Sequence, residues 1–410
     1  QVVEKLVKAS KLVVDLYEAQ VNEDLPGSTF YPADATKEEI KEAAEENPEI
    51  LSHYTVVERA DDGSLIAVPY HEKYSKEMGQ IADLLEEAAE ISEDEQFAEF
   101  LAARAKSFRD DSWSESEDLW LDLEDNKIDI LIGPIEPYLD ELFSVKYAFQ
   151  SNVRVSSDDN RFNPKDYIRV IRNLHASSPM EPSNYQEVKV RVDDVVCLSG
   201  RHAVLPPRGT NLPNDPEKVK EKGTKIIIYT TDIKLRDQDL ILPIFKKIFP
   251  TDFVDDYSDE ELMAAAIQLS MLHEITEAIV KYPDAVERLG DMYLPVKELH
   301  ASVVGLKSGT FHVLKGVLDQ KEYKAILAVL LARTFSDWLI KDKSGRNLMH
   351  YLRGYVVAFN FFCEHGGVNM ENSHISLDFE KLFVGMEGLA SVLTHLMSTG
   401  SCEEAKQFFD

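Results

Sequence analysis

The sequence predicts an α+β protein in which helices predominate, built as two lobes on either side of a cleft. Segments with strand character are confined to the first part of the chain, while from about residue 238 onward apolar residues recur almost everywhere at helical spacing. A mixed α/β part followed by a helical part indicates two packed lobes, and a cleft between lobes is a common ligand site. With 410 residues, the chain is long enough to bury a large core.

Helices are expected at three places in the first 110 residues. Residues 1–23 carry apolar side chains at the spacing of an amphipathic helix. A second helix should begin near Thr36, whose hydroxyl can cap it, with Glu39 following three residues later. Long helices are then expected between residues 73 and 109.

Strands are predicted from alternating or continuous apolar runs. A hairpin is expected where residues 54–59 and 64–69 flank Asp61-Asp62-Gly63, a sequence typical of tight turns. Further strands are expected at residues 129–134, 188–192 and 224–229.

Two segments between these strands are expected to be irregular. Residues 151–160 are polar and are predicted to form a linker. Residues 206–216 contain four prolines and are predicted to form a stiff loop.

The charge of the chain restricts its partners. Lys and Arg number 44 against 74 Asp and Glu, which gives a formal net charge of −30. Phosphate backbones and anionic membrane surfaces would repel such a chain, so neither nucleic acid nor membrane is an expected partner. No apolar run approaches the length of a membrane span. The scattered Cys197, Cys363 and Cys402 indicate free thiols rather than a disulfide framework, and a cytoplasmic location is expected.

The most informative stretch is His273-Glu274-Ile275-Thr276-Glu277. In the zinc-peptidase motif H-E-x-x-H, two histidines one helical turn apart bind a zinc ion, and the glutamate between them activates the metal-bound water. Residues 262–272 before it favour a helix, so the setting fits the motif, but Glu277 stands at the second histidine position. The sequence therefore indicates a protein that has the fold of a metallopeptidase but lacks its hydrolytic activity.

Short sequence motifs along almost the whole chain support this interpretation. In their order and spacing they resemble the M49 family of zinc metallopeptidases, the dipeptidyl peptidase III family, and in particular its bacterial and plant Nudix-associated branch. The motifs include Phe30-Tyr31-Pro32-Ala33-Asp34, Val68-Pro69-Tyr70-His71, Ile132-Gly133-Pro134-Ile135-Glu136-Pro137-Tyr138, Asn211-Leu212-Pro213-Asn214-Asp215, Phe359-Asn360-Phe361-Phe362 and Asp378-Phe379-Glu380-Lys381.

The resemblance implies a small β-core lobe that grips substrate and an all-helical lobe that carries zinc. The expected gripping lobe comprises residues 1–150 with about 185–235, and the expected zinc lobe comprises about 151–184 with 236–410. In such proteins the substrate lies in the cleft between the lobes.

The helical lobe departs from the family pattern at its metal ligands. Glu277 replaces one histidine, and the E-E-x-x-A-[DE] motif that supplies the third ligand aligns with Val304–Gly309, which contains no carboxylate. We therefore expect no metal and no other cofactor. If a relocated metal site exists, His273 and Glu277 could share the ion, with His300 or His312 nearby as a further ligand.

A histidine and an arginine that assist catalysis in the family are also replaced. Their aligned positions hold Tyr351 and Ala358, although His350 and Arg353 lie close in the sequence. We expect His350 and Arg353, like His273 and Glu277, to contact a ligand. Tyr351 is expected to take part in any catalysis together with Glu274 and Tyr138.

The gripping residues are intact by comparison. The resemblance implies that Glu136 holds a peptide ammonium, that Tyr138 lies near the reacting carbonyl, and that Asn211 and Asn214 bind peptide backbone. The cleft is therefore expected to bind a small organic or peptide-like ligand and to transform it, if at all, by a non-hydrolytic step such as isomerisation or cyclisation. The alternatives are a binding-only pseudopeptidase and a zinc-dependent dipeptidyl peptidase with a relocated metal site.

Overall fold

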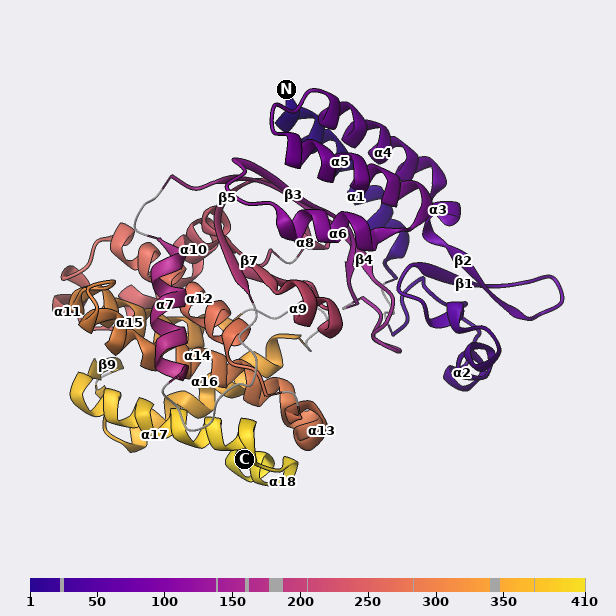
Figure 1. The fold of residues 1–410 in the computed structure, drawn as a ribbon. Coiled ribbons are helices and arrows are strands. Elements are labelled where there is room, and N and C mark those ends of the chain that lie inside the picture. Colours follow the sequence, from indigo (N-terminus) through magenta and orange to yellow (C-terminus); the bar gives the residue numbers. More distant parts are fainter. Residues whose placement is uncertain are drawn as a thin grey trace. The chain divides into compact units, whose positions relative to one another are not determined.

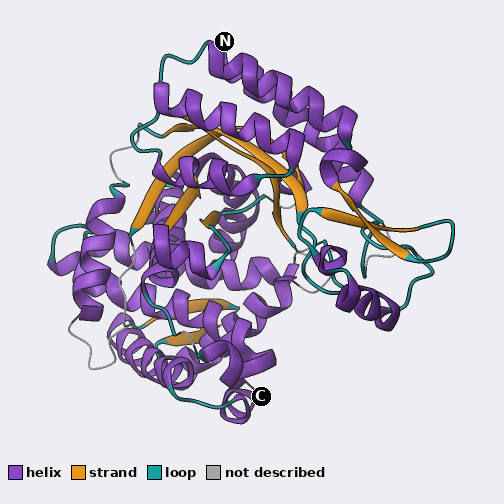
Figure 2. Ribbon diagram, turned by 45° about the vertical axis from the view of Figure 1, so that its right-hand side comes forward, coloured by secondary structure: helices purple, strands orange, loops and turns teal. Residues whose placement is uncertain are grey.

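A computed structural model describes residues 1–22, 26–137, 139–158, 162–176, 187–204, 206–282, 284–339, 347–371 and 373–409. Helices make up most of this part of the chain, and the strands form one five-stranded sheet and two hairpins (Figures 1 and 2). The expected α+β class with predominant helices is confirmed.

The chain divides into two compact units. The first, called here the mixed unit, comprises Gln1–Ser157 and Asp193–Pro207, and the second, called the helical unit, comprises Asp158–Val192 and Arg208–Asp410. Residues 208–235 thus fall in the helical unit, whereas the sequence analysis assigned them to the gripping lobe. A compact unit is not the same as one side of a cleft, so the expected lobes stay a prediction.

Helices of the mixed unit form where the sequence predicts them. The expected first helix is α1, whose apolar side chains Leu6 and Val13 are fully buried. The expected cap is present at α2, where Thr36 Oγ1 accepts a hydrogen bond from the backbone N–H of Glu39 at 3.1 Å. Helix α4 packs against both α1 and α5. The helices of this unit are α1 (Val2–Gln20), α2 (Lys37–Glu46), η1 (Pro48–Leu51), α3 (Tyr70–Lys73), α4 (Ser75–Glu90), α5 (Glu95–Asp110), α6 (Trp113–Asp122) and α8 (Arg201–Val204).

The predicted hairpin is present as strands β1 (Thr55–Arg59) and β2 (Leu65–Pro69), which pair antiparallel. The predicted strand at residues 129–134 is also present and is slightly longer, as β3 (Ile128–Glu136).

The predicted linker at residues 151–160 was wrong for its first part, which belongs to strand β4 (Ala148–Ser156). Strand β4 pairs antiparallel with β3 and with β5 (Val188–Gly200). Its polar residues Gln150, Ser151, Asn152 and Arg154 are buried rather than solvated, and Arg154 forms ion pairs of 3.1 Å with both Asp129 and Asp193. A polar sequence therefore indicated a linker where internal ion pairs stabilise a strand.

The predicted stiff loop at residues 206–216 also contains a strand, β6 (Gly209–Leu212). It pairs antiparallel with β7 (Thr224–Tyr229), which was expected at these residues. The sheet order is β3-β4-β5-β7-β6, so β6 is an edge strand. Strand β5 is divided between the units, since residues 188–192 belong to the helical unit and residues 193–200 to the mixed unit.

The helical unit is built around α12 and α14. A capping box at Ser258 and Glu261 starts α12, and most of its side chains are buried. Gly305 of α14 lies so close to α12 that an added Cβ would stand 2.6 Å from the carbonyl oxygen of Leu272. The elements of this unit are α7 (Pro164–Ala176), α9 (Pro216–Lys222), α10 (Thr230–Ile248), α11 (Thr251–Asp255), α12 (Asp259–Ile279), α13 (Ala285–Leu289), η2 (Gly290–Met292), α14 (Tyr293–Leu314), α15 (Gln320–Leu339), α16 (Asn347–Glu364), β8 (Val368–Glu371), β9 (His374–Leu377), α17 (Phe379–Ser398) and α18 (Cys402–Phe409).

Among the described helices, none combines the length and the apolar character that crossing a membrane requires. The expected cytoplasmic location stays a prediction.

Candidate functional site

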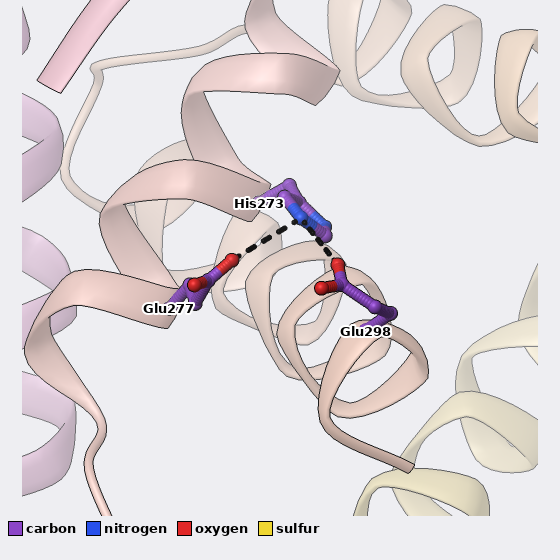
Figure 3. A group of neighbouring side chains, drawn as sticks. All are labelled: His273, Glu277 and Glu298. Carbon is purple, nitrogen blue, oxygen red and sulfur yellow. Dashed lines mark ion pairs between the residues drawn. The ribbon is translucent and has the colours of Figure 1, made fainter. Parts of the chain in front are cut away.

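Helices α12 and α14 bring three potential metal-binding side chains together. His273 and Glu277 lie one turn apart on α12, and Glu298 faces them from α14 (Figure 3). The distance from His273 Nε2 is 3.3 Å to Glu298 Oε2 and 3.7 Å to Glu277 Oε2. One donor atom from each residue lies within 4.8 Å of the others. The helical unit therefore holds a close group of one imidazole and two carboxylates.

Glu298 was not predicted from the sequence as a member of this group. The third-ligand motif was aligned with Val304–Gly309, but in the structure Glu298, more than one helical turn earlier, faces His273. Gly305 instead packs against the backbone of α12, which explains why no side chain stands at that position. A signal was available, because Lys297–Ser302 fits the E-E-x-x-A-[DE] pattern at its second glutamate and at its alanine.

A lysine completes the group. Lys297 Nζ lies 2.9 Å from Glu277 Oε1 and 3.2 Å from Glu298 Oε1. Burial would lower the pKa of Lys297, but the two carboxylates raise it well above its usual value, so the ammonium stays charged. Each carboxylate thus has one oxygen toward Lys297 and the other toward His273.

The imidazole of His273 has polar neighbours at both nitrogens. Its Nδ1 lies 2.9 Å from the hydroxyl oxygen of Ser302, and its Nε2 faces the carboxylates. Burial would lower the pKa of His273, but the hydrogen bond to Glu298 and the charges of Glu274, Glu298 and Glu277 outweigh burial and raise it. Burial would raise the pKa of Glu298, yet Lys297 and His273 bring it down to about 2. Glu298 is therefore ionised at neutral pH.

Glu274 lies beside this group and against the edge strand β6. A Cβ added to Gly209 would stand 2.6 Å from Glu274 Oε1, so the carboxylate rests on the backbone of that strand. Burial raises the pKa of Glu274 to about 7; the neighbouring His273 opposes this shift, and Glu277 and Glu298 add to it. A carboxyl group with such a pKa can both accept and donate a proton near neutral pH.

The zinc ion that the resemblance implies does not fit this arrangement well. Nε2 of His273 and the Oε2 atoms of Glu277 and Glu298 are the atoms that would coordinate the ion. The ammonium of Lys297 lies on both carboxylates that would serve as ligands. This ammonium opposes the binding of a divalent ion by the same carboxylates.

The other histidines considered for a relocated metal site lie elsewhere. The ring of His300 packs edge-on against Tyr282, and His312 packs against Tyr167. Among the described residues, the convergent group of potential ligands contains neither of them. The second carboxylate comes from Glu298 instead.

The expected gripping residues have partners of their own within their units. In the mixed unit, Glu136 Oε2 forms a 3.1 Å ion pair with Arg201, and burial raises the pKa of Glu136 although Arg201 opposes it. In the helical unit, Asn211 accepts a hydrogen bond from the hydroxyl of Thr224, and Asn214 is exposed. Tyr138 lies outside the described residues. The roles expected for these residues stay predictions.

The residues expected on α16 are only partly described. The side chains of His350 and Tyr351 lie outside the described part of the structure. The guanidinium of Arg353 lies over the ring of Phe409, 5.7 Å from its centroid. Ala358 is buried in the core of the helical unit.

Comparisons with known proteins agree with this architecture. No protein-family profile matches the sequence. The chain is 24% identical over 410 residues to Nudix hydrolase 3 of Arabidopsis thaliana; the match covers 92% of this chain and 52% of that protein, so the chain spans about half the length of this relative.

Two solved structures are similar over the full length of the chain. Dipeptidyl peptidase III from Caldithrix abyssi matches with a TM-score of 0.89 at 24% identity, covering 100% of this chain and 88% of that one. Dipeptidyl peptidase III from Corallococcus sp. strain EGB matches with a TM-score of 0.80 at 22% identity, covering 100% and 86%. This chain therefore has an M49-like fold, the fold of dipeptidyl peptidase III.

Proposed function

We propose that this chain is a metal-independent, non-proteolytic protein with the dipeptidyl peptidase III fold, whose site binds a small organic or peptide-like ligand. The observation that carries the proposal is the position of Lys297 Nζ, which lies 2.9 Å from Glu277 Oε1 and 3.2 Å from Glu298 Oε1. This ammonium already balances the charge of the two carboxylates that would serve as metal ligands. Without a metal, no bound water has the lowered pKa that peptide hydrolysis by this type of site requires.

Glu274 supports a catalytic role of a different kind. Its carboxylate is largely buried, rests on the backbone of Gly209 and is not part of the contacts that neutralise Glu277 and Glu298. A positioned carboxyl group of this kind can move a proton on a bound ligand, as an isomerisation or cyclisation requires. The expected binding roles of Glu136, Asn211 and Asn214 belong to the same proposal.

Metal analysis and a hydrolysis assay test the proposal together. The purified protein should contain no stoichiometric zinc, and dipeptidyl-arylamide substrates should not be cleaved above background, with or without added Zn²⁺ or Co²⁺. A Glu274→Gln variant is the matched control. Metal-dependent turnover that this variant abolishes would overturn the proposal.

A zinc-dependent dipeptidyl peptidase is the second candidate, and it is favoured by one observation. The donor atoms of His273, Glu277 and Glu298 lie within 4.8 Å of one another, on two helices. The assay above distinguishes it, because this candidate requires about one bound metal ion per chain.

A binding-only pseudopeptidase is the third candidate. It is favoured by the contact of Glu274 with β6, which gives this carboxylate a structural role even without catalysis. It is distinguished by product analysis once a ligand is known, because only a catalytic site converts the ligand and loses that conversion in Glu274→Gln.

A further inference from the structure

We infer that Lys297 is a built-in cation that closes a latent divalent-metal site formed by His273, Glu277 and Glu298. The inference rests on the proposed metal-independent function and explains how the fold can keep three converging donors without a metal. It assigns a positioning role to a residue that the sequence motif alone does not identify.

The four side chains form a closed ring in which nitrogen-bearing groups and carboxylates alternate. Going around it, His273 Nε2 lies 3.7 Å from Glu277 Oε2, and Glu277 Oε1 lies 2.9 Å from Lys297 Nζ. Lys297 Nζ then lies 3.2 Å from Glu298 Oε1, and Glu298 Oε2 lies 3.3 Å from His273 Nε2. All four carboxylate oxygens face a nitrogen of the ring.

The ring is well shielded from solvent, so its charges act strongly on one another. Side-chain exposure is 12% for His273, 18% for Glu277, 22% for Lys297 and 10% for Glu298. Screening by water is weak at such positions, and an unpaired charge there is unfavourable. Lys297 therefore does what a bound cation would do, since it brings the carboxylates of two helices together.

The same contacts oppose a divalent ion. An ion that used one oxygen of each carboxylate would lie close to an ammonium of the same sign, which raises the free energy of the bound state. Replacing Lys297 by a neutral side chain of similar length removes this repulsion. It also leaves two carboxylates and one imidazole, a donor set that suits Zn²⁺, Co²⁺ or Mn²⁺.

The experiment compares Co²⁺ and Zn²⁺ binding by the full chain and its Lys297→Met variant, using calorimetry and the visible absorption of bound Co²⁺. The expected result is at least a tenfold gain in affinity for Lys297→Met. The matched control, Lys297→Arg, keeps the positive charge and should show no gain. Lys297→Met combined with Glu298→Gln should lose the gain, because one of the three donors is removed.

A second pair of variants covers the case in which Lys297→Met does not fold. Glu277→His removes one negative charge and should bind Co²⁺ at least tenfold more weakly than Glu277→His combined with Lys297→Met. Equal affinities in this pair, or a folded Lys297→Met that gains nothing, would overturn the inference while leaving the proposed function intact. Stoichiometric metal in the unmodified protein, together with hydrolysis, would instead overturn the proposed function.

Discussion

Gly209 and Glu274 are in direct contact: a Cβ built on Gly209 would stand 2.6 Å from Oε1 of Glu274 and 2.7 Å from its Cδ. The absence of a side chain at Gly209 lets the edge strand β6 approach α12 at the position of the proposed proton-transfer group. Gly209 comes from the strand and Glu274 from the helix, so a substitution at either position alters this contact.

Gly209→Ala is expected to cost about 1–3 kcal/mol of unfolding free energy, the usual effect of overpacking, because the new methyl group displaces the Glu274 carboxylate. In a Glu274→Ala background the same change should cost much less. Urea unfolding of the four proteins in this cycle measures the coupling. Gly79→Ala is the control, since nothing lies within 4 Å of the added Cβ, and it should stabilise helix α4 by about 0.5–1 kcal/mol. An equal cost of Gly209→Ala in both backgrounds would show that the contact with Glu274 is not responsible.

Ser302→Ala is expected to destabilise the protein by about 0.5–1.5 kcal/mol, since it removes the 2.9 Å hydrogen bond at His273 Nδ1. Ser308→Ala is a matched control on the same helix, because the Ser308 hydroxyl only bonds the carbonyl of Gly305 one turn earlier. The difference between the two variants should disappear in a His273→Ala background. If it persists there, Ser302 does not act through His273.

Glu136→Gln and Asn214→Ala should each weaken binding of a dipeptide with a free ammonium group by roughly 1–3 kcal/mol, if the expected gripping roles hold. Titration calorimetry with such a dipeptide measures this. Glu136 is paired with Arg201, so Arg201→Met should strengthen binding by freeing the carboxylate for the ligand ammonium. Unchanged affinity in all three variants would remove Glu136 and Asn214 from the site.

Lys146 should make the stability of the protein depend on pH. Its ammonium is fully buried, and burial lowers its pKa to about 7, although Asp140 and Glu49 oppose the shift. Its pKa in the unfolded chain is about 10.4. Between these values the unfolded chain binds more protons, so this group makes stability rise with pH from about 7 to about 10.

The Lys146→Met variant should lack this rise. The comparison is made on the slope of unfolding free energy against pH, because the variant also loses the hydrogen bonds of Lys146 to Ser52 and Thr55. The difference between the two proteins should change by at least about 1.4 kcal/mol across this range, the equivalent of one pKa unit. Parallel slopes would show that Lys146 stays charged in the folded protein.

Elements that depend on local sequence were predictable. Thr36 caps α2 as its position suggests, and the Asp61-Asp62-Gly63 turn joins two paired strands. Strand β4 was not predictable, because the charge of its buried Arg154 is balanced by a partner far away in the sequence, Asp193. A pattern of polar and apolar residues does not show which charges will meet.

The same limit applies to the candidate site. The spacing of His273 and Glu277 placed both on one helical face, as the structure shows. The contact with Glu298 depends on how far α14 is shifted along α12, and the close packing of Gly305 on Leu272 fixes that shift. The role of Lys297 depends in addition on the direction of a long side chain, which sequence spacing does not specify.

The division of each unit into two chain segments affects how such a protein can evolve and how its chain can be cut into fragments. The chain passes between the units after Ser157, after Val192 and after Pro207, so no single cut separates them. A fragment that ends at Ser157 would lack Asp193, the partner of Arg154, and the β5 residues that pair with β4. Recombination at one point in the gene could not exchange one unit for another. The two units can therefore only be exchanged or inherited together.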